Sequence, residues 1–288
     1  MRTRERNKSR EKNLSSYICA GCAVLLSIVL FLFIFGSVQG NPKQQEVKIL
    51  VFGDSVLGEV RDGTGVPAQL EALLGEKVYN GALGGTCAAR GVQDRQLDYT
   101  RGAFSLVALV KAVEADDFGV QRAAAVREIN TDYFAEVIDG LSTIKLSGVD
   151  TFLIQQGIND YQQGIPIENP EDPYDEYTYL GALRTAVESL KKTAPGARII
   201  FVTPLFTWYV AERTTCETEN FGGGFLEDYV NAEIALAGEL DLEVIDLYHD
   251  FLPHEDWEDW RLYSKDGMHP NEAGREKMAR KLAEYLKE

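Results

Sequence analysis

Three side chains of this sequence, a serine, a histidine and an aspartate, are of the types that carry out nucleophilic acyl transfer. Ser55 ends the turn-forming tripeptide Gly53-Asp54-Ser55, and His269 follows Asp266 by three residues near the C-terminus. A serine hydroxyl is a weak nucleophile and needs a base within hydrogen-bond reach, and an imidazole suits that role because its pKa is near 6.5. An aspartate about one turn earlier can accept a hydrogen bond from the second ring nitrogen and fix the tautomer.

Two further segments carry the hydrogen-bond donors that such a reaction needs at the developing oxyanion. One is the glycine-rich turn 80–85, and the other is Gly157-Ile158-Asn159-Asp160. Alone, each segment has a plainer explanation, because Gly-Asp-Ser is a common turn and Asn-Asp commonly caps a helix. The occurrence of all the segments in one chain, three of them directly after predicted strands, favours a shared site.

The elements that would position these residues follow from the hydrophobic pattern. Apolar runs at 47–52, 77–80, 151–155, 198–203 and 242–247 predict strands, and helical patterns follow at 67–74, 105–145, 177–192, 225–240 and 271–287. Largely apolar strands that alternate with helices are typical of a parallel sheet covered on both faces. We therefore expect an α/β protein, a three-layer α/β/α sandwich with a mainly parallel five-stranded sheet. Ligands bind beyond the carboxyl ends of such strands, so the chemical residues should meet on one rim.

In these four segments the sequence resembles the SGNH hydrolases, also called GDSL esterases and lipases. Their four signature blocks match Ser55, a glycine of the 80–85 turn, Asn159, and Asp266 with His269. The resemblance implies that Ser55 is the nucleophile, His269 the base and Asp266 the residue that orients it. It also implies hydrolysis of an ester with no cofactor and no metal.

The resemblance covers about residues 47–288 and implies an SGNH, flavodoxin-like domain. It further implies an oxyanion hole formed by the N–H groups of Ser55 and Gly85 and the side-chain amide of Asn159. Gly84 is the alternative donor in the second block, and Gly85 is favoured by its position in the turn.

The N-terminus differs sharply from the rest of the chain. Residues 1–42 hold six basic and two acidic side chains, a balance of +4, which leaves −20 for the remainder. Residues 14–38 are uncharged, and about 20 apolar residues suffice to cross a hydrocarbon core of about 30 Å. Basic residues before the span indicate a cytoplasmic N-terminus. The expected order is a basic cytoplasmic tail over 1–13, a transmembrane signal-anchor over 14–38, a linker over 39–46 and the hydrolase domain over 47–288.

This order places the domain outside the cell on a single-pass membrane protein. A signal peptide cleaved after Gly40 is the alternative, and it would give a secreted protein. The acidic body repels phosphate backbones, so we expect no nucleic-acid partner. The expected partners are the membrane, through the N-terminal helix, and a small-molecule or glycan ester as substrate.

Two pairs of residues leave alternatives open. Cys87 and Cys216 can form a bridge outside the cytoplasm or remain two buried thiols. His249 and His254 lie near several acidic residues, but their spacing matches no metal motif.

The aromatic residues Trp208, Tyr209, Trp257 and Trp260 are expected in loops on the rim, where they either stack on sugars or cover the core. Together these features predict a membrane-anchored extracellular serine esterase that hydrolyses acetyl or short-chain acyl esters, with carbohydrate as a candidate alcohol. The alternatives are an acyltransferase that uses the same serine and a surface binding module without turnover.

Overall fold

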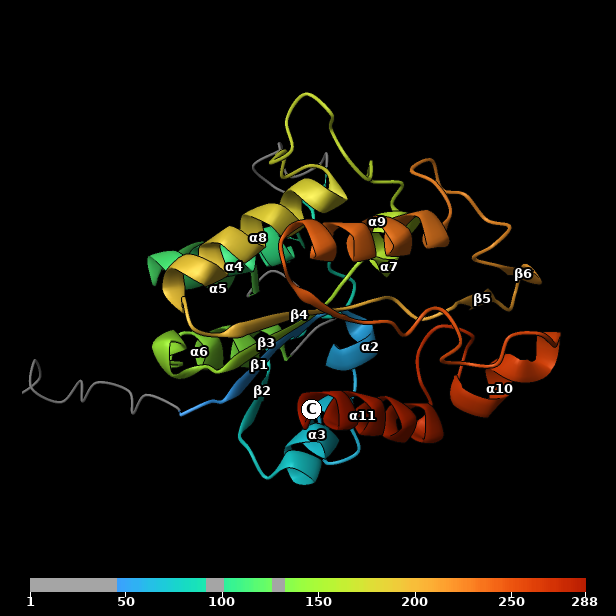
Figure 1. The fold of residues 1–288 in the computed structure, drawn as a ribbon, viewed down its shortest axis with the longest axis horizontal. Coiled ribbons are helices and arrows are strands. Elements are labelled where there is room, and N and C mark those ends of the chain that lie inside the picture. Colours follow the sequence, from blue (N-terminus) through green and yellow to red (C-terminus); the bar gives the residue numbers. More distant parts are fainter. Residues whose placement is uncertain (1–45, 92–100, 126–132) are drawn as a thin grey trace, which may run out of the picture. The chain divides into compact units, whose positions relative to one another are not determined.

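A computed structural model of the protein describes residues 46–91, 101–125 and 133–288. Its centre is a five-stranded parallel sheet in the order β2-β1-β3-β4-β7 (Figure 1). The strands are β1 (Ile49–Gly53), β2 (Val78–Asn80), β3 (Thr151–Gln155), β4 (Arg198–Val202) and β7 (Glu243–Ile245). The predicted α/β class and the parallel five-stranded sheet are therefore confirmed.

Helices cover both faces of this sheet, and every residue of β1 and β3 is buried as a result. Figure 1 shows α4, α8 and α9 on one face and α3 with α11 on the other. The longer helices are α3 (Val66–Leu74), α4 (Leu106–Ala115), α5 (Gly119–Ala125), α6 (Phe134–Leu141), α8 (Tyr179–Thr193), α9 (Leu226–Glu239) and α11 (Glu272–Leu286). The strands are largely apolar, so each must bury both of its faces. Helices on both sides of the sheet provide that burial.

Several short elements complete the fold, and the sequence pattern did not predict them. They are α2 (Ser55–Gly58), α7 (Ile158–Gln162), α10 (Trp260–Tyr263), the 3₁₀ turns η2 (Arg101–Phe104), η3 (Leu146–Gly148) and η4 (Trp257–Asp259), and the antiparallel pair β5 (Trp208–Tyr209) and β6 (Thr214–Thr215). The expectation that Trp208, Tyr209, Trp257 and Trp260 lie in loops is wrong. Trp208 is 2% exposed and packs edge-on against Phe206, so it belongs to the core.

The disulfide alternative is also wrong, because Cys87 and Cys216 are both buried and no bridge joins them. The Cys216 sulfur accepts a hydrogen bond from the Thr207 N–H at 3.4 Å, and the Cys87 sulfur accepts one from Gln163 Nε2 at 3.1 Å.

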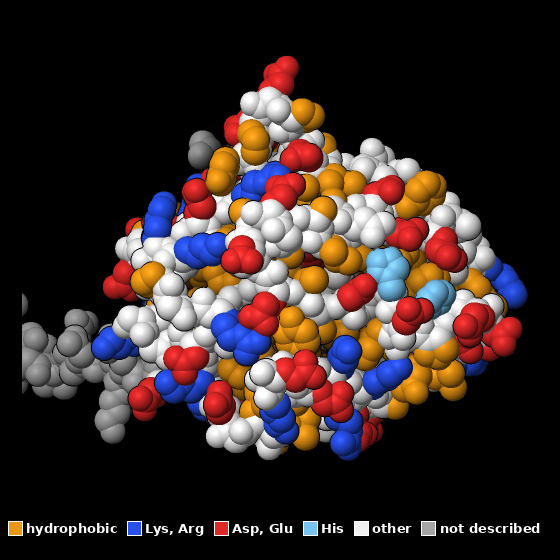
Figure 2. Space-filling model, in the orientation of Figure 1, with side chains coloured by type: hydrophobic (Ala, Val, Ile, Leu, Met, Phe, Trp, Pro, Cys, Tyr) orange, Lys and Arg blue, Asp and Glu red, His pale blue; other side chains and the backbone are white. Residues whose placement is uncertain are grey.

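The N-terminal predictions lie outside the described residues. This holds for the tail 1–13, the transmembrane segment 14–38, the cleavage point after Gly40 and all of the linker 39–46 except Glu46. Among the residues that are described, no helix has the length and apolarity needed to cross a membrane. On the face drawn in Figure 2, acidic and basic side chains are intermixed with apolar ones.

Candidate active site

The proposed nucleophile stands where β1 ends and a short helix begins. Asp54 caps α2, and its Oδ1 accepts a hydrogen bond from the Val56 N–H at 2.9 Å. Ser55 is the first residue of that helix and is partly exposed, while Asp54 is fully buried. The turn therefore lifts the Ser55 hydroxyl out of the core at the carboxyl end of the sheet.

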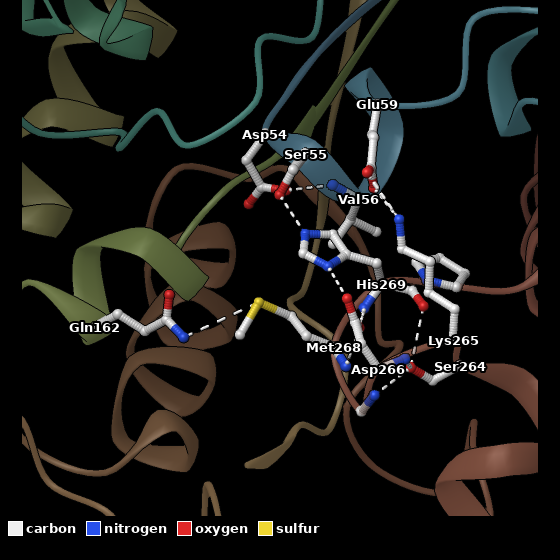
Figure 3. A network of polar contacts seen from close by, with 12 residues as sticks. Asp54, Ser55, Val56, Glu59, Gln162, Ser264, Lys265, Asp266, Met268 and His269 are labelled. Carbon is white, nitrogen blue, oxygen red and sulfur yellow. Dashed lines mark hydrogen bonds and ion pairs between the residues drawn. The ribbon is translucent and has the colours of Figure 1, made fainter. Parts of the chain in front are cut away.

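His269 and Asp266 meet Ser55 in the order that the sequence predicted (Figure 3). His269 Nε2 lies 3.0 Å from Ser55 Oγ, and His269 Nδ1 lies 2.8 Å from Asp266 Oδ2. Partial burial alone would raise the pKa of Asp266, but hydrogen bonds from the His269 N–H, the His269 ring and the Met268 N–H bring that pKa below its usual value. An ionised Asp266 accepts from Nδ1–H, which leaves Nε2 to accept the proton of the Ser55 hydroxyl.

The loop that carries Asp266 and His269 is fixed by its own hydrogen bonds. Asp266 Oδ1 accepts from the His269 N–H at 2.8 Å, and Ser264 Oγ accepts from the Gly267 N–H at 2.7 Å. Gly267 has φ +96°, and a Cβ there would lie 2.3 Å from the Trp208 carbonyl oxygen. Only glycine fits this position, so the Asp-Gly-Met-His spacing is tied to one backbone conformation.

Two N–H groups beside the nucleophile point to no acceptor. Within the described segments, the N–H groups of Ser55 and Gly85 donate no hydrogen bond inside the protein. The Gly84 N–H, in contrast, donates to Tyr133 Oη at 2.8 Å. Gly84 lies against the serine, since a Cβ on it would be 3.5 Å from Ser55 Cβ. This geometry favours Gly85 over Gly84 as the second-block donor, and its contact with a substrate stays a prediction.

The third predicted donor, Asn159, belongs to α7 and is joined to the same loop. Its Nδ2 donates to the Thr86 carbonyl at 3.0 Å, and an amide nitrogen carries a second hydrogen for another acceptor. The next residue, Asp160, is fully buried and accepts from the N–H groups of Ala88 and Ala89 at 2.9 and 3.0 Å. Helix α7 therefore holds the loop that follows the second block.

Asp54 and Asp160 support the backbone turns that they contact. Burial raises the pKa of Asp54 to about 7 and that of Asp160 to about 6. Both carboxyls bind backbone N–H groups and neither is within the hydrogen-bond network of His269.

Sequence reasoning missed Arg61, which ties the nucleophile helix to the second block. Its guanidinium donates to the carbonyls of Gly58, Ala82 and Asn80, the one to Ala82 at 3.1 Å. The guanidinium also lies 5.0 Å from the centre of the Tyr133 ring. No motif or periodicity marks Arg61, so only the folded chain reveals this contact.

The two other histidines, His249 and His254, make their contacts with residues other than the serine, the aspartate and the histidine described above. His249 Nδ1 contacts Asp246 Oδ2 at 2.7 Å, and its Nε2 is 3.8 Å from Glu227, while His254 stacks on Phe206. The described residues contain no group of three or more side chains suited to hold a metal ion.

Comparisons with known proteins identify a family and a shared fold. A model of the GDSL-like lipase/acylhydrolase family matches residues 51–277. No curated protein matches the chain. A protein from Lactobacillus plantarum has 19% identity and a TM-score of 0.60, and the match covers 84% of this chain and 97% of that one. A protein from Chitinophaga pinensis, described as a possible lipase, has 19% identity and a TM-score of 0.55, with 84% and 98% covered. At these identities the two structures show a shared fold.

Proposed function

The chain belongs to the GDSL-like lipase/acylhydrolase family and is a serine ester hydrolase, and on this premise we propose that Ser55, His269 and Asp266 are its catalytic triad. The observation that carries the proposal is the continuous chain of contacts, 3.0 Å from Ser55 Oγ to His269 Nε2 and 2.8 Å from His269 Nδ1 to Asp266. These distances are within the range needed for proton transfer between a nucleophile and its base.

The proposed reaction has two halves. Ser55 Oγ attacks the ester carbonyl carbon while its proton passes to His269 Nε2, and a tetrahedral oxyanion forms. The intermediate collapses as the bond to the alcohol oxygen breaks, and His269 gives that oxygen its proton. Water then attacks the acyl-serine, passes a proton to His269, and the second collapse returns this proton to Ser55 Oγ and releases the acid. Asp266 stabilises the imidazolium in both halves.

The oxyanion would be bound by the unoccupied N–H groups of Ser55 and Gly85 and by the amide of Asn159. Support comes from the absence of acceptors for these two N–H groups in the described residues and from the attachment of Asn159 to Thr86. Removal of one such donor typically costs about 10²–10³ in kcat.

We also propose that the enzyme works outside the cell, anchored by residues 14–38. The uncharged span and the six basic residues before it support this placement. The acyl group of the proposed substrate is an acetyl or another short chain. The buried Trp208 lends no support to a sugar substrate.

The triad is tested with the full chain purified in detergent. We expect p-nitrophenyl acetate and butyrate to be hydrolysed faster than longer esters, and Ser55→Ala to lower kcat by at least about 10³-fold. His269→Ala should be as damaging, because the two residues act as a unit.

The matched control is Ser147→Ala, which removes an exposed serine from η3, next to the opposite end of β3. Ester hydrolysis at equal rates by the wild type and Ser55→Ala would contradict the proposal.

A further inference from the structure

We propose that Gln162 and Tyr209 form the subsite for the alcohol part of the ester and select alcohols that carry several hydroxyl groups, as a sugar does. The inference rests on the proposed function, because it takes Ser55 and His269 as the reacting pair.

Gln162 lies on the side of the site next to the base. It follows Asn159 by three residues in α7, and residues at that spacing share one helix face. Its Nε2 is 4.0 Å from the sulfur of Met268, the residue before His269. Figure 3 shows the Gln162 side chain pointing toward Met268, with the His269 ring between Met268 and Ser55.

Tyr209 reaches the same place from a different element. It belongs to β5, which is fastened to the histidine loop because the Trp208 N–H donates to the Gly267 carbonyl at 2.9 Å. Gln162 Nε2 lies 3.3 Å from Tyr209 Oη, and both side chains are partly exposed. An amide and a phenol from two separate elements therefore stand together next to Met268, the residue that precedes the base.

The chemistry of the reaction assigns this side to the alcohol. His269 must give its proton to the departing alcohol oxygen, so the alcohol has to lie against the imidazole rather than against the oxyanion donors. A group bound next to Met268 is in that position.

Tyr209 Oη also shares a hydrogen bond with the side chain of Tyr161, so the unused hydrogen-bonding capacity of the pair lies mainly on the Gln162 amide. An amide offers two donors and an acceptor, and a phenol offers one donor and an acceptor. Among the described residues, the partners of the Gln162 nitrogen lie at 3.3 and 4.0 Å, both longer than the usual 2.7–3.2 Å. A ligand hydroxyl at normal distance would be a better partner, and an alcohol without hydroxyls would leave the pair unsatisfied when it displaces water.

The test compares two acetate esters of similar shape, 6-O-acetylglucose and cyclohexylmethyl acetate, with the full chain in detergent. Gln162→Met and Tyr209→Phe keep side-chain size and remove hydrogen-bonding atoms. Each should lower kcat/KM for the sugar ester about 10-fold, mainly through a higher KM. The rate with the cyclohexyl ester should stay the same or rise, because the variants no longer leave polar atoms unsatisfied beside an apolar alcohol, and this rate also shows that the variants are folded.

Control variants are Gln163→Met, whose amide contacts Cys87 instead, and Tyr174→Phe, whose ring is on an exposed loop. Neither should change the ratio of kcat/KM for the two esters.

A ratio that stays at the wild-type value in both Gln162→Met and Tyr209→Phe, while hydrolysis still depends on Ser55, overturns the inference alone. Equal losses with both esters overturn it as well, since they indicate a structural role. If neither ester nor p-nitrophenyl acetate is hydrolysed in a Ser55-dependent way, the proposed function fails and the inference falls with it.

Discussion

Asp54, next to the proposed nucleophile, caps helix α2 and is fully buried. A capping carboxylate is usually charged, whereas burial disfavours the charge. One oxygen accepts the Val56 N–H, and the other has no hydrogen-bond partner among the described residues. Burial, with a smaller contribution from the charge of Asp160, raises the pKa of Asp54 to about 7. The folded protein therefore binds this proton more tightly than the unfolded chain does.

This difference predicts how stability depends on pH. An unfolded aspartate loses its proton near pH 3.9, whereas folded Asp54 keeps it to about pH 7, so stability present at low pH is lost between about pH 4 and 7. The pKa difference corresponds to at most about 4 kcal/mol. Relative to Asp54→Asn, the free energy of unfolding of the wild type should fall across this window and level off above it.

The free energy of unfolding of both proteins is measured by urea unfolding followed by circular dichroism at several pH values. Asp241→Asn is the control, since Asp241 is exposed, and its curve should parallel that of the wild type. Parallel curves for Asp54→Asn and the wild type would contradict a raised pKa.

Residue spacing alone could not single out the proposed triad, and the order of the segments along the chain was needed as well. Asp246 and His249 have the same spacing as Asp266 and His269 and make the same carboxylate–imidazole contact, at 2.7 and 2.8 Å. In the part of the chain that the structure describes, no serine contacts the second ring nitrogen of His249, which instead faces Glu227. The order of the segments along the chain, which fixes their place on the rim, separated the two pairs.

At the scale of elements, the site depends on how α2 and the turn 80–85 are fastened together. Arg61 donates to carbonyls of both, and Asn80 Nδ2 donates to the Leu57 carbonyl at 3.0 Å. Their separation would move the N–H of Gly85 relative to Ser55, and displacements of about 1 Å can cost about 10²-fold in rate.

We therefore expect Arg61→Met to lower kcat for p-nitrophenyl acetate about 10-fold or more. The methionine keeps much of the apolar stem and removes the donors. The measurement is kcat together with Tm, because a loss of stability alone would not affect turnover well below Tm.

Arg184→Met is the matched control. The Arg184 side chain is 10% exposed, more buried than the exposed Arg61, and it bonds to Glu168 and Glu239. It should lower Tm and leave kcat unchanged. Equal effects of the two variants on kcat would count against a positioning role for Arg61.

The long strands and helices followed from the sequence because their hydrophobic period extends over enough residues to be recognised. The four residues of α2, the five of α7 and the two-residue strands β5 and β6 are too short to show one. These short elements carry Ser55, Asn159, Gln162 and Tyr209, so the least predictable parts of the fold hold most of the site. Contacts such as those of Arg61 form only when distant segments meet.

At the scale of the whole chain, the uncharged span 14–38 and the basic residues before it favour a membrane-anchored protein with its domain outside the cell. We expect the full chain to be found in the membrane fraction, with a C-terminal tag accessible to protease added outside intact cells. N-terminal sequencing should find the original N-terminus and not Asn41. Deletion of residues 1–40 is the control and should leave the protein in the cytoplasm.

Recovery of a protein that begins at Asn41 would replace the anchor with a cleaved signal. A tag protected from external protease would contradict an extracellular domain.

The hydrogen bond between Ser55 and His269 joins residues 214 positions apart. Ribosomes add about 5–20 residues per second, so the base is synthesised roughly 10–40 seconds after the nucleophile. During that interval the nascent chain has a serine without its base and cannot turn over an ester by the proposed route. If the chain is exported as it is made, catalysis begins only after the last helix has crossed, and the esters of the compartment that makes the enzyme are never exposed to it.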